Sequence, residues 1–231
     1  VFKLFCSGIS KNDSIEQVDR LASCNVKSYM HYASENIKSE EGMDKSLARV
    51  IDTLKFSSGK SAIPFSVFKA TSLGPISLFE KKSSGINLSF EEKKTWSRVL
   101  ERIEVCCENA KNLKVRIFID AEESWIQPAI DEIAESMMNK FNTKEAFVFT
   151  TIQMYRKDRL AYLKKIIGDA EKKKFLIGVK LVRGAYMEKE NIRAKQIGIS
   201  SPICDNKKAT DLNFDKALEF IIERVNICNL F

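Results

Sequence analysis

The stretch FLIGVKLVRGAYME, residues 175–188, decides the fold class of this chain. It begins as an apolar, β-branched run that has no polar residue before Lys180, which is typical of a strand covered by helices on both faces. The run ends in Lys180, Arg183 and a Gly-Ala-Tyr turn, and a polar helical stretch follows. Two cations and an aromatic residue therefore stand at the carboxyl end of a predicted parallel strand, where α/β folds place their chemistry.

The rest of the chain alternates between strand-like and helical patterns. Strand patterns are predicted over residues 26–32, 63–68, 115–119 and 146–152, before the strand that opens the quoted stretch. Each is followed by a helical stripe, the last of them running from Phe214 to Val225. Serine and glutamate or glutamine three residues apart predict capping boxes at Ser14 and Ser89. This alternation indicates right-handed βαβ units and a parallel sheet.

The loop after the first strand excludes one common α/β fold. Residues 32–35 read YASE and contain no GxGxxG fingerprint, so a dinucleotide-binding fold of that type is not expected. A (β/α)8 barrel of the TIM type fits the pattern better. Because only about five of its eight β/α units are present and five strands cannot close a barrel, we predict a single, incomplete barrel domain over residues 1–231.

Composition excludes several classes of protein. The net charge is +7, from 38 Lys+Arg and 31 Asp+Glu, but the lysines are scattered over helical segments without interleaved aromatics, so no nucleic-acid partner is expected. Six cysteines without a CxxC pair and one histidine, His31, predict neither a disulfide framework nor a metal site. No apolar run reaches the roughly 18 residues of a membrane span. The chain begins at Val1 and stops at Phe231 within an apolar stretch, so we expect it to be cut at both ends.

Polar residues stand at the ends of four predicted strands. A cation, a carboxylate and an amide follow the second, third and fourth strands, and two cations follow the fifth. In a barrel these ends face one pocket, so together they offer a cation for a substrate carboxylate and polar groups for an electron-rich ring. Each taken alone has an ordinary reading, such as an exposed cation or a helix N-cap. The residues are Lys69, Asp120, Gln153, Lys180 and Arg183.

Four segments in the same order resemble the motifs of proline dehydrogenases. They contain the pattern K-x-T-x-L-G, the segments DAE and QPAI, the pattern T-x-Q-x-Y-x-K-D, and KLVRGAY. Together they span most of the chain, which makes the resemblance specific. The segments are residues 68–74, 115–130, 151–158 and 180–187.

The resemblance implies a flavoenzyme on a distorted (β/α)8 barrel. Such an enzyme oxidises L-proline to Δ1-pyrroline-5-carboxylate by hydride transfer to N5 of FAD and passes the electrons to quinone. The eukaryotic members are mitochondrial and associate with the inner membrane. Carried over by position, Lys69 would bind the proline carboxylate, Asp120 would organise the site, and Lys180 would be the basic residue near flavin N5. Tyr186 would line the substrate pocket. Ala121, Gln153, Arg183, Gly184 and Ala185 would lie along the flavin.

The chain departs from the family pattern in two places. The first strand commonly ends in Asp-Tyr, whereas here it ends in His31-Tyr32, and we interpret His31 as structural. The family's sixth to eighth strands and its final helix, with an arginine pair that clamps the substrate carboxylate, are expected beyond Phe231. A chain without that pair should bind proline and FAD weakly and show little activity.

Three functional readings therefore stay open. The first is a part of an FAD-dependent proline dehydrogenase. Hydroxyproline dehydrogenase is a close variant that would share nearly all of these motifs. The third reading belongs to another class, a truncated, non-catalytic barrel that acts as an interaction protein.

Overall fold

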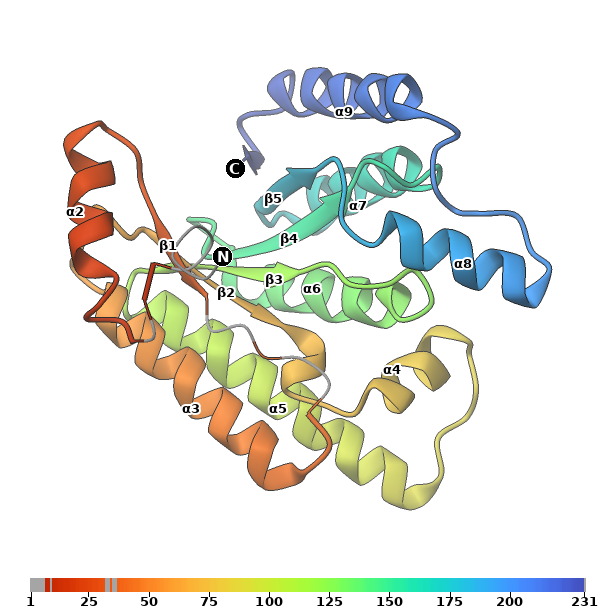
Figure 1. Ribbon diagram of the computed structural model, residues 1–231, viewed down its shortest axis with the longest axis horizontal. Coiled ribbons are helices and arrows are strands. Elements are labelled where there is room, and N and C mark those ends of the chain that lie inside the picture. Colours follow the sequence, from red (N-terminus) through yellow and green to blue (C-terminus); the bar gives the residue numbers. More distant parts are fainter. Residues whose placement is uncertain (1–6, 9, 32–33, 35–36, 231) are drawn as a thin grey trace.

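Six parallel strands form one sheet in the order β1-β2-β3-β4-β5-β6 (Figure 1). The computed structural model describes residues 7–8, 10–31, 34 and 37–230. The strands are β1 (Tyr29–His31), β2 (Phe65–Lys69), β3 (Arg116–Asp120), β4 (Val148–Gln153), β5 (Ile177–Val182) and β6 (Cys228–Leu230). The helices are α2 (Ile15–Ser23), α3 (Glu40–Ser57), α4 (Ile76–Ser83), α5 (Phe90–Asn112), α6 (Gln127–Phe141), α7 (Arg159–Lys173), α8 (Met187–Ile197) and α9 (Lys207–Ile222), with a 3₁₀ turn, η1, at Ala70–Ser72.

The incomplete barrel predicted from the alternation is confirmed, but the strand count is wrong by one. β6 pairs in parallel with β5, with Ile177 opposite Cys228 and Val179 opposite Leu230. Three residues are too few to show a strand period, so pairing with the edge of β5, and not local sequence, determines this strand. The expectation that the sixth strand lies beyond Phe231 is therefore also wrong. Within the described residues β1 and β6 each have one strand neighbour, so the sheet stays open.

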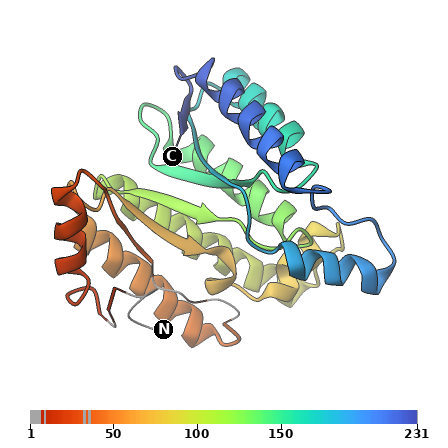
Figure 2. The ribbon, with the colours of Figure 1, turned by 45° about the horizontal axis from the view of Figure 1, so that its top comes forward.

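The two faces of the sheet bury different side chains. The outer face packs against the helices in a core of mostly aliphatic residues, among them Ile117, Ile119 and Val179. The inner face carries an aromatic cluster in which the rings of Phe65 and Phe118 stack with centroids 4.4 Å apart. Figure 2 shows α3, α5, α6 and α7 running along one side of the sheet.

Gly178 in β5 is required by this inner aromatic cluster. A Cβ atom at this position would stand 2.5 Å from the carbonyl oxygen of Val148 and 2.6 Å from the ring of Phe149. Both distances are shorter than real Cβ contacts, and one of the groups is backbone that cannot move aside. The glycine within the decisive stretch is thus explained by close approach of β4.

Of the two predicted capping boxes, one is present and the other is absent. At α5 the capping box is present, since Ser89 Oγ accepts from Glu92 N and the Glu92 carboxylate accepts from Ser89 N. Helix α2 begins where expected, but the capping box predicted at Ser14 is absent. Ser14 already has helical dihedral angles, φ −83° and ψ −12°, and its hydroxyl donates to the Ser10 carbonyl instead.

Other elements also differ from the sequence-based expectations. The first strand covers only Tyr29–His31 of the predicted 26–32, and Tyr32 lies outside the described residues. α9 ends at Ile222 and not at Val225, and it begins at Lys207 behind an Asn206 cap. Helix α4 was not predicted, because its eight residues carry only two buried apolar side chains.

Asn142 joins the amino ends of β4 and β5. Its Nδ2 donates to the carbonyls of Val148 (2.7 Å) and Leu176 (3.0 Å), and its Oδ1 accepts from the amides of Phe147 and Val148. The side chain is fully buried, so all four bonds are shielded from water.

Asn142→Ala is therefore expected to lower the free energy of unfolding by about 3–5 kcal/mol, since several buried backbone groups lose their partner. Urea unfolding measures the change. Asn109→Ala is the matched control, because Asn109 donates one bond within its own half-exposed helix. A loss for Asn142→Ala no larger than that of the control would contradict the prediction.

Candidate active site

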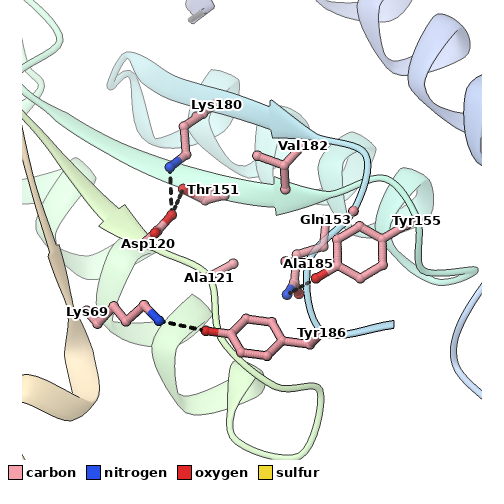
Figure 3. A pocket seen from close by; sticks show the side chains of 11 residues that line it. Lys69, Asp120, Ala121, Thr151, Gln153, Tyr155, Lys180, Val182, Ala185 and Tyr186 are labelled. Carbon is pink, nitrogen blue, oxygen red and sulfur yellow. Dashed lines mark hydrogen bonds and ion pairs between the residues drawn. The ribbon is translucent and has the colours of Figure 1, made fainter. Parts of the chain in front are cut away.

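A pocket of about 400 Å³ lies at the carboxyl ends of β2 to β5 and the start of α8 (Figure 3). Because side chains alternate along a strand, residues two apart point to the same side, and this places two pairs in the pocket wall, Thr151 with Gln153 on β4 and Lys180 with Val182 on β5. The lining residues carry two ammonium groups and one carboxylate. They are Lys69, Asp120, Ala121, Thr151, Gln153, Tyr155, Lys180, Val182, Gly184, Ala185 and Tyr186.

An ion pair occupies one side of the pocket. Lys180 Nζ lies 2.6 Å from Asp120 Oδ1, and the Thr151 hydroxyl donates to the same oxygen at 3.2 Å. Strand pairing explains this meeting, because Thr151 stands opposite Lys180 in the β4–β5 register. The ammonium also lies 4.9 Å from the centroid of the Phe118 ring, on the inner aromatic cluster. Both charged groups are mostly shielded from solvent, which strengthens their attraction.

Lys69 and Tyr186 face each other on the other side. Lys69 is the last residue of β2 and stands opposite Asp120 in the β2–β3 register. Its Nζ donates to the Tyr186 hydroxyl at 3.0 Å, and burial raises the pKa of that hydroxyl, while the hydrogen bond from Lys69 lowers it. The phenol is therefore neutral at physiological pH and serves as an acceptor beside the ammonium.

Helix α8 brings Tyr186 to the pocket, and a buried carboxylate holds this helix in place. Glu190, in the first turn of α8, accepts from the amide and the hydroxyl of Ser124, both at 2.6 Å. Ser124 lies in the loop that follows β3. The bonds tie the loop after β3 to α8 across 66 residues of sequence.

Gln153 forms a fixed part of the pocket wall. Its Nε2 donates to the Glu122 carbonyl (2.7 Å) and to the Tyr155 hydroxyl (2.9 Å), and its Oε1 accepts from Arg156 at 3.1 Å. Burial raises the pKa of Tyr155 to about 12, so this hydroxyl is also neutral. The three bonds determine the orientation of the Gln153 amide before any ligand binds.

Of the nine residues singled out in the sequence, eight line the pocket, and Arg183 does not. The Arg183 guanidinium lies 3.3 Å from Asp211 and 4.8 Å from the centroid of the Phe214 ring, both on α9, and its side chain is more than half exposed. The structure thus groups eight of the predicted residues and places Arg183 on the neighbouring surface. A role for Arg183 beside a cofactor stays a prediction.

Sequence reasoning missed Thr151, Tyr155 and Val182. Strand alternation is the signal that could have found two of them, since Thr151 precedes Gln153 by two residues and Val182 follows Lys180 by two. His31 is at the end of β1, opposite Val67, and does not belong to the pocket lining. A structural role for His31 stays a prediction.

Glu122 lies directly behind the pocket and has an unusual protonation equilibrium. Burial raises its pKa from 4.5 to about 7, against the lowering effect of hydrogen bonds from Thr71 and the charge of Lys69. Because the folded state holds this proton more tightly than the unfolded state, Glu122 contributes stability that is complete below pH 4.5. That stability is lost as the pH rises through about 7.

Glu122→Gln is expected to remove this pH dependence. Between pH 4.5 and pH 8, the free energy of unfolding of the parent should change unfavourably by roughly 3 kcal/mol relative to that of the variant, which is the equivalent of the pKa shift. Urea unfolding of both proteins at the two pH values gives the comparison, in which the pH effects of other groups cancel. Equal pH dependence in the two proteins would show that Glu122 is not protonated in this range.

Fold and pocket together define a class of protein. A parallel, barrel-type α/β domain with a charged pocket at the carboxyl ends of its strands has the arrangement of barrel enzymes. The sequence comparison specifies the class further: the family model described as proline dehydrogenase matches residues 14–231. The chain belongs to the proline dehydrogenase family.

Individual relatives agree with this assignment. The chain is 30% identical over 230 residues to the carbapenem antibiotics biosynthesis protein CarD of Pectobacterium carotovorum subsp. carotovorum, covering 98% of this chain and 60% of that protein. It is 39% identical over 140 residues to mitochondrial proline dehydrogenase 1 of Caenorhabditis elegans, covering 61% of this chain and 23% of the relative. Hydroxyproline dehydrogenase of Xenopus laevis is 31% identical, over 65% of this chain and 32% of that protein.

A solved structure has the same fold. Proline utilization A (PutA) from Bdellovibrio bacteriovorus, inactivated by N-propargylglycine, superposes with a TM-score of 0.83 at 20% identity, over 99% of this chain and 25% of that one. The chain thus spans less than two thirds of the length of the relatives it matches. Across its described residues, no helix has the length and apolar character to span a bilayer, and no cluster of three His, Cys, Asp or Glu side chains could hold a metal ion.

Proposed function

We propose that this protein takes part in the FAD-dependent oxidation of L-proline to Δ1-pyrroline-5-carboxylate, with quinone as the electron acceptor. The observation that carries the proposal is the convergence of Lys69 and the Asp120–Lys180 pair on one pocket. An excess of one positive charge among the lining residues suits a substrate that carries a carboxylate. Membership in the proline dehydrogenase family supplies the substrate class.

The residues present fit a flavin. Ala121, Gly184 and Ala185 form a stretch of wall with little side-chain bulk, and a Cβ built on Gly184 meets only the Met187 sulfur, at 3.5 Å. These three residues, with Gln153 and Arg183, would hold the cofactor, and Lys180 would stand beside its electron-rich ring. Bound FAD would supply a two-electron acceptor for the hydride that leaves the proline ring.

Each charged side chain would have a separate task. Lys69 would bind the substrate carboxylate, and the Tyr186 hydroxyl would keep the Lys69 ammonium directed into the pocket. Asp120 would hold Lys180 in place, and the positive charge of Lys180 would favour the addition of electrons to the ring beside it. The inner aromatic cluster under Lys180 would keep water from the reacting atoms.

Location and further partners rest on the relatives. Several of them are named as mitochondrial proteins, including those of Caenorhabditis elegans and Homo sapiens, and we extend this location to the present protein. Transfer of electrons to quinone implies contact with the inner membrane on the matrix side. No nucleic-acid partner is proposed.

A flavin spectrum tests the proposal. The protein, expressed from its complete coding region, should be yellow, and anaerobic L-proline should bleach the flavin band near ~450 nm. Bleaching by hydroxyproline and not by proline would assign it to the hydroxyproline dehydrogenases, which the likeness to the Xenopus laevis relative keeps open. A colourless protein would favour the non-catalytic reading.

A further inference from the structure

A buried carboxylate outside the pocket lining bonds to the turn that carries Lys69. Glu122 is only 2% exposed and follows the end of β3 by two residues. Its Oε1 accepts from the backbone amide of Thr71 at 3.1 Å, and its Oε2 accepts from the Thr71 hydroxyl at 2.5 Å. One side chain thus makes two bonds to a residue 51 positions earlier.

Thr71 lies at the centre of η1, the turn that directly follows Lys69. All three residues of this turn are buried, and the Ser72 hydroxyl donates to the Lys69 carbonyl at 2.7 Å. The backbone of Lys69 is therefore held from two sides, by its place at the end of β2 and by the turn after it. A shift of Thr71 would therefore move the Cα and Cβ atoms of Lys69.

The backbone of Glu122 is itself held by β4 and by α6. Its amide donates to Gln127 Oε1 at 2.8 Å, and its carbonyl accepts from Gln153 Nε2 at 2.7 Å. Gln127 donates in turn to Asp131, which forms a buried two-bond pair with Arg159 of α7. Glu122 consequently connects the end of β2 to a polar network that is anchored in two helices.

We propose that Glu122 is a positioning residue for Lys69, and that it sets the affinity of the pocket for an anionic ring substrate by fixing the η1 turn. The substrate part of this inference rests on the proposed function. Glu122 does not line the pocket, and its hydrogen-bonded connection to Lys69 passes through Thr71. Loss of the two bonds to Thr71 should therefore weaken substrate binding and leave the later chemical steps largely unchanged.

The experiment compares four single variants and one double variant of the complete protein with bound FAD. Glu122→Ala is expected to raise KM for L-proline by about 10- to 100-fold, the usual effect of a small displacement of a binding group, with kcat within about 3-fold of the parent. Glu122→Gln should keep KM within about 3-fold of the parent value, because its amide oxygen still accepts from Thr71 N.

Thr71→Val removes only the hydroxyl and should raise KM by about 3- to 10-fold. The same substitution should add little to the effect of Glu122→Ala when the two are combined. Glu123→Gln removes a neighbouring charge that contacts Lys189 and not Thr71, and it serves as the control.

Two readouts keep this inference separate from the proposed function. Calorimetric binding of cyclopentanecarboxylate, an anionic ring without the amine, requires no turnover and should weaken in Glu122→Ala by the same factor as KM rises. Hydrogen exchange of the Thr71 amide should become faster in that variant. Unchanged probe affinity or unchanged exchange in Glu122→Ala would overturn the positioning role, even if proline bleaches the flavin. A parent protein that binds the probe but is not reduced by proline would refute the proposed function alone.

Discussion

Replacing Lys69 by methionine is expected to raise KM for L-proline by about 100-fold, while the affinity for FAD changes by less than about 3-fold. Methionine keeps most of the length of the side chain and removes its charge. A charge-assisted hydrogen bond contributes about 1.5–3 kcal/mol, and the upper part of this range corresponds to the expected factor. Steady-state kinetics and a flavin titration of the same preparations measure the two quantities.

The matched control for this prediction is Lys189→Met. Lys189 lies on α8 close to the pocket but outside its lining, and its side chain is more than half exposed beside Glu123. The same chemical change there should leave KM within about 2-fold, because Lys189 does not line the pocket. Equal losses of proline and FAD affinity in Lys69→Met would show that Lys69 supports the whole pocket and does not bind the carboxylate in particular.

Local sequence patterns predicted the candidate site well where strand ends determine it. Lys69, Asp120, Gln153 and Lys180 each follow or end an apolar run, and parallel strands bring such ends to one edge of the sheet. All four line one pocket in the structure. The fold class followed from the same alternation of strands and helices. Each element buries one or both of its faces, and the apolar pattern of its own residues shows this burial.

Other features depend on contacts that no local pattern records. β6 is three residues long and exists by pairing with β5. The direction of the Arg183 side chain is determined by Asp211 and Phe214 on a distant helix, so its position in a motif could not predict its surroundings. Glu122 belongs to the quoted DAE segment, but its two bonds to Thr71 become visible only when β2 and β3 are side by side.

The largest catalytic effect is expected from Lys180→Met. The substitution removes the positive charge beside the proposed flavin and leaves the Asp120 carboxylate without its closest partner, at 2.6 Å in the parent. An unpaired carboxylate in a shielded pocket opposes the arrival of electrons on the adjacent ring. We expect flavin reduction by proline to slow by about 100- to 1000-fold, which is the usual effect of losing one preorganised electrostatic group.

A double-mutant cycle with Asp120→Asn tests whether the two residues act as a pair. Removing one member of a shielded ion pair costs more than removing both, because the remaining charge stays uncompensated. The variant with both substitutions should therefore reduce its flavin faster than Lys180→Met alone, by about 10-fold, with a flavin potential shifted back toward that of the parent. Stopped-flow reduction under anaerobic conditions and a potential titration measure both effects. If the effects of the two substitutions simply add, Asp120 does not act through Lys180, and its part in the site must be sought in its hydrogen bond from Thr151.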